Sequence, residues 1–282
     1  MRLYAFAVFY LILLFKSTIA VGAPPDSLDF YRNIRNMDLS SLWRSDSINI
    51  MENEQDAHGK RIYYTTLTER FPEPYGFIGK DYQRFYIHYL TVKRDTGNHY
   101  LYHVTGKTKV KDSVRNFHGT ITVVRAKVCK DPTIMIMPKP DNKSNEIIFR
   151  QGIAMCDIKF MEDTARAKSG TITGRLATLF YLDSAQHIFY NNLNTISDSY
   201  CNNQVTGIWK MNKADSMKRC NWGDYRIPYC GDLDQGAGGF SPADKYLSNG
   251  WQNYSDANFG GPETPKSKKA AALEYVRWWK LQ

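Results

Sequence analysis

Two pairs of acidic residues have the types that glycoside hydrolysis uses, Glu162-Asp163 and Asp232/Asp234. That reaction needs two carboxyl groups roughly 5 to 9 Å apart. The first pair falls in a predicted polar turn, where solvated acids are expected. The run Asp232 to Gly236 is similar to the first half of a calcium loop, but Ala243 stands where an EF-hand carries its bidentate Glu. We therefore predict a turn stabilised by Asp side chains, and no catalytic residue.

Three histidines, His88, His103 and His118, fall on successive predicted strands and suggest zinc chemistry. The predicted register separates two of them by four positions along the strand, which is about 13 Å and too far for ligands of one metal. No GxSxG, HExxH or P-loop motif is present. The sequence therefore predicts neither a metal site nor a cofactor.

The segment from Trp222 to Cys230 places aromatic residues, Asp224 and Arg226 beside a proline. Such a segment can hold side chains in fixed positions although it forms neither a helix nor a strand. We predict a rigid lid over one end of the fold, with Arg226 paired to Asp224 or to strand-end carbonyls. Direct ligand contact by Trp222 and Arg226 is the alternative, and the two are compatible if the lid closes a cavity.

The elements that would position these residues are period-two segments with turn signals between them, such as Asp95 to Asn98 and Lys111 to Ser113. Tight turns join antiparallel neighbours, and about eight strands can close into a barrel without exposed edges. We predict an all-β fold, an antiparallel meander closing into a lipocalin-like barrel. The predicted strands are 61–68, 83–94, 99–110, 116–129, 146–160, 170–182, 187–191 and 204–211.

Glycines interrupt five of these strands, each on the apolar side of the period: Gly106, Gly119, Gly152, Gly174 and Gly207. Glycine weakens a strand, so its recurrence indicates sharp coiling, a bulge, or room left for a ligand. Turns centred at 96–97 and 112–113 place Ile87 opposite Gly106, and Gly106 opposite Gly119. The glycines therefore share the core face of the predicted barrel.

Residues 1–23 have the composition of a secretory signal, with an apolar stretch from Leu3 to Phe15 and small residues suited to cleavage after Ala20 or Ala23. The stretch is too short for a transmembrane helix, and no later segment approaches ~20 apolar residues. We expect a mature chain of roughly 260 residues that is secreted or periplasmic and not membrane-spanning.

The formal charge of +9 falls to +7 on cleavage, because Arg2 and Lys16 leave with the signal and no acid does. The remaining Lys and Arg are scattered, whereas a nucleic-acid binder shows a clustered basic face. We expect no nucleic-acid partner. A solvated basic surface is the main interpretation, with attraction to anionic glycans or lipid headgroups as the alternative.

Five cysteines, an odd number, leave at least one thiol unpaired in an exported monomer: Cys129, Cys156, Cys201, Cys220 and Cys230. We favour a Cys220–Cys230 disulfide and a buried Cys156 thiol. Thr264-Pro265 supplies an N-cap and first-turn proline for a C-terminal helix to about Lys280. Packing of that helix on the barrel and docking of a partner both stay open. The predicted parts are a signal peptide 1–23, an N-terminal segment 24–60, a barrel 61–212, an irregular cysteine-containing segment 213–262 and a helix 263–282.

Four blocks of sequence carry a resemblance: Phe77-Ile-Gly79, Asn203-Gln-Val-Thr-Gly207, Cys220-Asn-Trp-Gly-Asp-Tyr-Arg-Ile-Pro228 and Cys230-Gly-Asp-Leu-Asp234. In them the chain resembles a family of uncharacterised secreted proteins of gram-negative bacteria, over most of the mature chain. The resemblance implies no activity and no catalytic residue. The strand pattern is also similar to lipocalin and avidin barrels in architecture only, since Ser41-Leu42 precede Trp43 where a lipocalin has Gly-x-Trp.

Three functions fit these features. The first is an exported, non-enzymatic protein that binds a small apolar or amphipathic molecule in the barrel. The second is a protein-interaction module that uses the C-terminal helix and basic face, and the third is a glycan-directed hydrolase. For the first, the predicted ligand-binding residues are Tyr89, Tyr102, Val104, Gly106, Phe117, Gly119, Ile121, Trp209, Trp222 and Arg226.

Overall fold

The computed structural model describes residues 26–55, 61–138, 144–165, 168–193, 195, 197–261 and 263–280. Helical segments are few: α2 (Tyr31–Ile34), α3 (Ser40–Trp43), η2 (Asp244–Asn249), α4 (Gln252–Phe259), α5 (Pro265–Glu274) and η3 (Trp278–Lys280). Strands dominate: β1 (Ser27–Asp29), β2 (Ser47–Gln55), β3 (Arg61–Arg70), β4 (Tyr75–Ile78), β5 (Gln83–Arg84), β6 (Tyr86–Arg94), β7 (Leu101–Val110), β8 (Ser113–Cys129), β9 (Thr133–Pro138), β10 (Ser144–Glu162), β11 (Gly170–Leu182), β12 (Ile188–Tyr190), β13 (Asn202–Met211) and β14 (Met217–Asp224).

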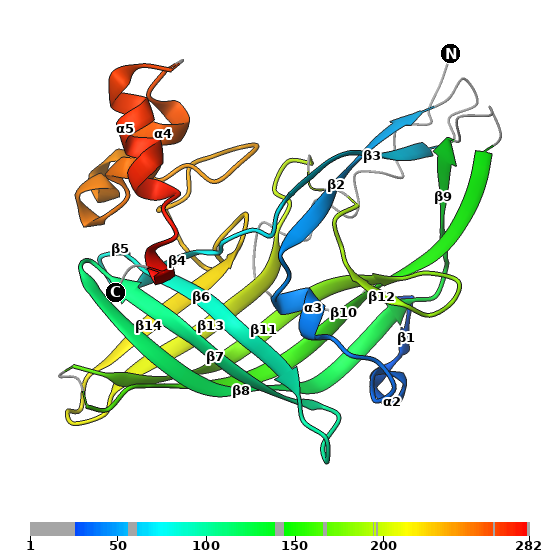
Figure 1. The fold of residues 1–282 in the computed structure, drawn as a ribbon, viewed down its shortest axis with the longest axis horizontal. Coiled ribbons are helices and arrows are strands. Elements are labelled where there is room, and N and C mark those ends of the chain that lie inside the picture. The colour runs from blue at the N-terminus through cyan, green and yellow to red at the C-terminus, as the bar shows by residue number, and fades with distance from the viewer. Residues whose placement is uncertain are drawn as a thin grey trace.

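The main sheet is a strongly curled antiparallel half-barrel (Figure 1). Its neighbouring strands follow the order β6–β7–β8–β10–β11–β13–β14–β4–β5. Phe85 alone separates β5 from β6, and its N–H donates to the Gly76 carbonyl at 2.9 Å. The two edges of the curl therefore meet at one residue. This confirms the predicted all-β, antiparallel, barrel-like class with a C-terminal helix.

The strands differ from the prediction in two ways. The predicted strand 61–68 lies in β3, which pairs with β2 and touches β9 in an arm that leaves the curled sheet (Figure 1). Strands β1, β2, β4, β9 and β14 were not predicted, and β14 belongs to the segment expected to be irregular. Residues 220–224 of β14 are all buried, because Trp222 faces the barrel core while Asn221 Nδ2 donates to the Pro228 carbonyl on the other face at 2.9 Å. A strand covered on both faces shows no two-residue period.

The inward glycines serve close packing of the sheet on itself. Gly106 pairs with Phe117, Gly119 with Phe160 and Gly152 with Phe180, and in each case the opposite ring lies where a Cβ would be. Gly174 and Gly207 pair with each other, backbone against backbone. Coiling explains these positions, and the interpretation that they leave room for a ligand is wrong because neighbouring rings and backbone fill the space.

The predicted pairs of Gly106 are displaced by two residues in both tested hairpins. Tyr89, not Ile87, is opposite Gly106, and Phe117, not Gly119, is Gly106's partner on β8. The β7–β8 turn lies one residue earlier than expected, since Val110 pairs directly with Ser113. A bulge between Tyr89 and Thr91 adds one further position in the part of β6 that follows it. A shift of two keeps side chains on their predicted face, so the core face was right on β7, on β8 and on β6 as far as Tyr89, although the pairs were not.

We expect Gly119→Ala to destabilise the fold by about 1–3 kcal/mol or more, because overpacking against fixed backbone cannot relax. The added methyl would lie closer than 3.0 Å to the Lys159 carbonyl oxygen and to Phe160. Chemical unfolding measures the change. Gly97→Ala is the control, since its nearest neighbour is an Asp95 oxygen at 3.5 Å. Equal stability of the two variants would contradict the packing role.

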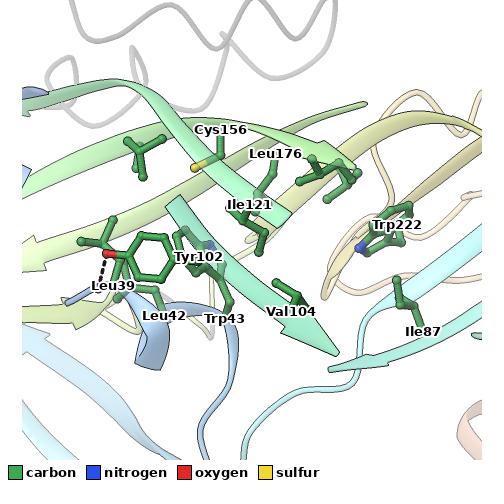
Figure 2. Close-up of a cluster of buried hydrophobic side chains, with 14 of the residues drawn as sticks. Leu39, Leu42, Trp43, Ile87, Tyr102, Val104, Ile121, Cys156, Leu176 and Trp222 are labelled. Atoms are coloured by element: carbon green, nitrogen blue, oxygen red, sulfur yellow. Dashed lines mark hydrogen bonds between the residues drawn. The ribbon is translucent and has the colours of Figure 1, made fainter. Parts of the chain in front are cut away.

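The centre of the barrel is filled by an N-terminal plug, residues 39–43, which lies in the curve of the sheet (Figures 1 and 2). The Leu39 N–H donates to the Tyr102 hydroxyl at 3.1 Å, and Trp43 Nε1 donates to Thr178 Oγ1 at 2.7 Å. The rings of Trp43 and Tyr102 meet edge to face with centroids 4.9 Å apart. The plug thereby occupies the lumen that a simple barrel would leave for a ligand.

The C-terminal helix begins as predicted: Thr264 Oγ1 accepts the Ser267 N–H at 3.1 Å, with Pro265 in the first turn. It ends at Glu274, earlier than the predicted Lys280, and Glu274 forms a buried ion pair with Arg84 of β5 at 2.9 Å. Residues 278–280 then pack on the barrel as η3. Across the described ranges, none of the helices combines the length and apolarity that a bilayer crossing requires.

All five cysteines lie among the described residues and carry free thiols. The favoured Cys220–Cys230 disulfide is therefore wrong. Cys220, a residue of β14, belongs to the barrel core, whereas Cys230 packs against a separate hydrophobic cluster, so the two thiols are buried in different clusters. Cys156 is fully buried as predicted, and burial raises the pKa of its thiol far above the ordinary range.

Candidate functional site

Three of the sequence blocks singled out above form one wall of the barrel. Phe77 on β4 pairs with Asn221 on β14, and Trp222 on β14 pairs with Val205 on β13. The pairing of β13 with β14 is interrupted by a register shift between Asn202 and Val205. Bulges of this kind redirect side chains and are frequent beside functional sites.

The bulge turns Asn203 toward the interior. Its φ is 46°, in the left-handed region that asparagine tolerates better than most residues. Asn203 Nδ2 donates to Asp224 Oδ2 at 2.8 Å and to the Leu42 carbonyl of the plug at 2.9 Å. Asn203 Oδ1 accepts from Thr178 Oγ1 at 2.9 Å, and Thr178 in turn accepts from Trp43. One hydrogen-bond network thus connects the plug, the wall of the barrel and the Asp224 carboxyl.

Asp224 is the acid at the end of this network. It is almost fully buried, and its Oδ2 accepts from both Asn203 and the Tyr190 hydroxyl, the latter at 3.0 Å. Its Oδ1 accepts no hydrogen bond from the part of the chain that the structure describes. Burial, with the charge of Glu73, raises the pKa of Asp224 to about 8, although the two hydrogen bonds oppose this.

A cavity of about 280 Å³, here called the inner cavity, opens beside Asp224 and Asn203. Its apolar walls come from the plug, β6, β11 and β14, and Trp222 Nε1 donates to the Tyr89 hydroxyl at 3.3 Å across one side. Ile87, Leu176 and Trp222 all point into the same interior (Figure 2). Aromatic and aliphatic side chains beside the buried Asp224 and Asn203 are typical of a small-molecule site, and charged residues such as Arg70, Glu73 and Lys280 also line this cavity. The wall residues are Trp43, Ile87, Tyr89, Leu176 and Trp222.

The C-terminal residues 277–280, here called the tryptophan lid, border the entrance to the inner cavity. Trp279 stacks on His88 with ring centroids 3.8 Å apart, and the Arg70 guanidinium lies 4.7 Å from its ring centroid. Glu73 holds both neighbours, at 2.9 Å from His88 Nδ1 and 2.7 Å from Arg70 Nη2. Trp279 is therefore fixed by stacking on His88 and by the Arg70 guanidinium, and Glu73 holds both of these side chains in place.

No family model, curated protein or solved structure matches this chain. The resemblance to secreted bacterial proteins stays a prediction. The chemistry of the site has to be argued from its geometry alone.

Two of the predicted ligand-binding residues, Tyr89 and Trp222, line the inner cavity. Tyr102, Val104, Phe117 and Ile121 are packed in the core with the plug, and Gly106 and Gly119 are covered by phenylalanine rings. Trp209 lies toward the other end of the barrel and lines a second cavity.

Arg226 lies away from both cavities. It forms an ion pair with Asp234 at 2.6 Å and donates to the carbonyls of Gly236 and Gly238, at 2.8 and 2.6 Å. Its role is to hold the loop after β14, and the predicted pairing with Asp224 is replaced by the Asp234 pair. The 222–230 segment splits accordingly, with Trp222 and Asp224 at the cavity and the remainder outside it.

Sequence reasoning missed Asn203, Asp224, Trp43 and Trp279 as members of the site. Asn203 stood in a block that was singled out, but only the bulge turns it inward. Asp224 was expected only as a partner of Arg226. Trp43 and Trp279 lie far apart in the sequence, which concealed that both line one cavity.

The acids first considered for catalysis have structural partners. Glu162 is buried rather than solvated, and accepts from Thr108 Oγ1 at 2.6 Å, the Gly170 N–H at 2.9 Å and Trp209 Nε1 at 3.0 Å. The expectation of a polar turn at Glu162 is wrong because β10 continues to this residue. Asp232 bonds Lys245 and Tyr246, and the Lys245 hydrogen bond lowers its pKa.

The three histidines of the predicted strands have separate surroundings. His88 pairs with Glu73, and His103 Nε2 lies 2.8 Å from Asp95 Oδ2. Within the described ranges, no group of three His, Cys, Asp or Glu side chains is arranged to hold a metal ion.

The buried Asp224 predicts a stability that falls as pH rises from about 4 to about 8, at up to about 1.4 kcal/mol per pH unit. In that window the folded state retains the Asp224 proton while the unfolded chain releases it, since the folded pKa is raised. Asp224→Asn removes this contribution, so the variant gains stability relative to wild type at pH 9. Urea unfolding at pH 5, 7 and 9 measures both proteins.

The control for this pH series is Asp157→Asn, which removes an acid that is exposed and paired with Arg175 at 2.7 Å. We expect it to keep the wild-type pH dependence. Parallel pH profiles for wild type and Asp224→Asn would show that the Asp224 carboxyl titrates in its ordinary range.

Proposed function

We propose that this protein is an exported binding protein whose inner cavity holds one small amphipathic molecule. The hydrogen-bond-donating or cationic end of the ligand contacts Asp224, and its apolar body lies between the rings of Trp43, Tyr89 and Trp222. The observation that carries the proposal is a buried carboxyl at the wall of the inner cavity, beside aromatic and aliphatic side chains, whose Oδ1 accepts no hydrogen bond from a described residue.

The chemistry of the site favours a donor such as an organic amine. A buried carboxylate is costly unless a cation or donor compensates it, and the described residues supply no cation to Asp224. Aromatic faces attract organic cations as well. The volume lies near the lower end of the range for ligand pockets, about 300–1,000 Å³, which suits a compact molecule.

Export rests on the composition of residues 1–23, which lie outside the described residues. We propose a secreted or periplasmic location for the mature chain, in line with the predicted signal. Intact mass of the protein from the culture medium or periplasm would give the cleavage site, expected after Ala20 or Ala23.

The interaction-module alternative loses its main anchor, because Trp278 and Trp279 pack on the barrel with less than a tenth of their surface exposed. Phe259, Leu273 and Tyr275 stay exposed on the C-terminal segment as scattered apolar residues, which single surface positions often are. For the hydrolase alternative, the Asp232 and Asp234 carboxylates are engaged by Lys245 and Arg226. Both observations favour the binding proposal over these two.

Native mass spectrometry of the exported protein, before and after organic extraction, tests the proposal. We expect a bound species before extraction, and saturable 1:1 binding of tryptamine as an added probe afterwards. Asp224→Asn should weaken tryptamine binding at least tenfold, while Asp157→Asn leaves it within twofold. A chain of sequence mass before extraction that also fails to bind tryptamine would contradict the proposal.

A further inference from the structure

A second cavity lies at the opposite end of the barrel, where the turns after β7, β10 and β13 come together with the turn after β4. Its volume is about 1010 Å³, several times that of the inner cavity. We call it the mouth basin. No described residue lines both cavities. Glu162, held by three donors, lies in the wall of the mouth basin.

The interior wall of the mouth basin is apolar. The wall is formed by side chains on the inward face of the strands, namely Ile78, Phe85, Val110, Trp209 and Met211. The Lys218 ammonium lies 5.9 Å from the centroid of the Trp209 ring, which places a cation directly beside this apolar surface. An apolar floor with cations at its edge is complementary to an anionic amphiphile.

The rim of the basin carries an excess of positive charge. Among the described residues that line the basin, six are cationic and two, Asp81 and Glu162, are acidic. Four lysines of the rim are exposed and form no ion pair with any described residue. Cations that converge on a concave surface without carboxylate partners raise the local concentration of anions. These four lysines are Lys80, Lys111, Lys168 and Lys218.

We propose that the mouth basin binds a single anionic amphiphile, with its carboxylate, sulfate or phosphate group on the rim lysines and its apolar chain on the Phe85–Trp209 floor. This site is independent of the inner cavity and would take a ligand of opposite polarity. A membrane surface rich in anionic headgroups offers the same headgroup chemistry as a free anionic amphiphile. Its acyl chains are held in the bilayer, however, and are not free to enter the basin. Binding of a free amphiphile and binding to a membrane can therefore be separated by experiment.

Isothermal titration of the mature protein with decanoate and with decyltrimethylammonium tests the proposal, because the two amphiphiles share a chain length and differ in head charge. We expect decanoate to bind 1:1 and at least tenfold more tightly than the cationic amphiphile. Lys111→Gln, Lys168→Gln and Lys218→Gln, combined in one variant, should weaken decanoate binding at least tenfold.

The matched control combines Lys93→Gln, Lys130→Gln and Lys269→Gln, three exposed lysines outside the basin lining. It removes the same net charge and should leave the decanoate affinity within twofold. Equal affinity for the two amphiphiles, equal loss in both triple variants, or no saturable decanoate binding would each overturn the proposal. Co-sedimentation with phosphatidylglycerol vesicles without decanoate binding would overturn it in favour of a membrane surface.

Discussion

Glu274→Ala is expected to lower the free energy of unfolding by about 3–5 kcal/mol, the cost of breaking a buried ion pair from one side. The side chains of Arg84 and Glu274 are each only 3 % exposed, and Arg84 Nε and Nη1 have no hydrogen-bond partner among the described residues. The guanidinium also lies 4.1 Å from the centroid of the Trp251 ring and 4.7 Å from that of Tyr86. Without the Glu274 carboxylate, the Arg84 guanidinium stays buried among aromatic rings with no opposite charge to compensate it.

The control for this pair is Glu263→Ala, which breaks an exposed ion pair with Lys268 at 3.2 Å and should cost less than about 1 kcal/mol. The double variant Arg84→Met with Glu274→Leu should recover most of the loss, because apolar residues of similar volume satisfy the same space. If urea unfolding gives Glu274→Ala and Glu263→Ala the same small cost, the ion pair does not fasten α5 to the barrel.

Trp43→Ala is expected to cost about 3–5 kcal/mol as well, since it removes a large buried ring from the plug. The change also deletes the Nε1 donor to Thr178 and one wall of the inner cavity. Thermal or urea unfolding measures the loss.

Trp43→Phe separates the ring from its hydrogen bond. It retains most of the apolar surface and loses the Thr178 contact, so a cost nearer 1 kcal/mol is expected. Tyr275→Ala, at an exposed position, is the control and should stay within about 0.5 kcal/mol of wild type. A Trp43→Ala variant as stable as the Tyr275→Ala variant would mean that the plug is not part of the folded core.

Local signals in the sequence were sufficient for much of the fold. Period-two alternation predicted the strands of the meander because one face of each is buried and the other is wet. The Thr264-Pro265 signal predicted the start of the C-terminal helix, since an N-cap acts within its own first turn. The glycine pattern predicted the core face, because a register error of two leaves side-chain direction unchanged.

Long-range features were not accessible in the same way. Residues 220–224 of β14 are buried on both faces, so they carry no alternation, and Pro228, which accepts the hydrogen bond on the outer face, lies after the strand in the sequence. The Glu162 environment depends on Thr108 and Trp209, which come from other strands. The inner cavity arises only where the plug, the β13 bulge and the tryptophan lid meet. The spacing of residues within one segment gives no information about how these three distant segments pack together.

The titration of the Asp224 carboxyl, followed by its ¹³C chemical shift in selectively labelled protein, tests the central claim most directly. In protein freed of bound species by organic extraction, the midpoint should lie at about 8. Saturation with tryptamine should move it to lower pH, because a donor on Oδ1 stabilises the charged form. A midpoint near 4 in the free protein, or one that tryptamine leaves unchanged, would contradict the assignment of Asp224 as the polar end of a ligand site.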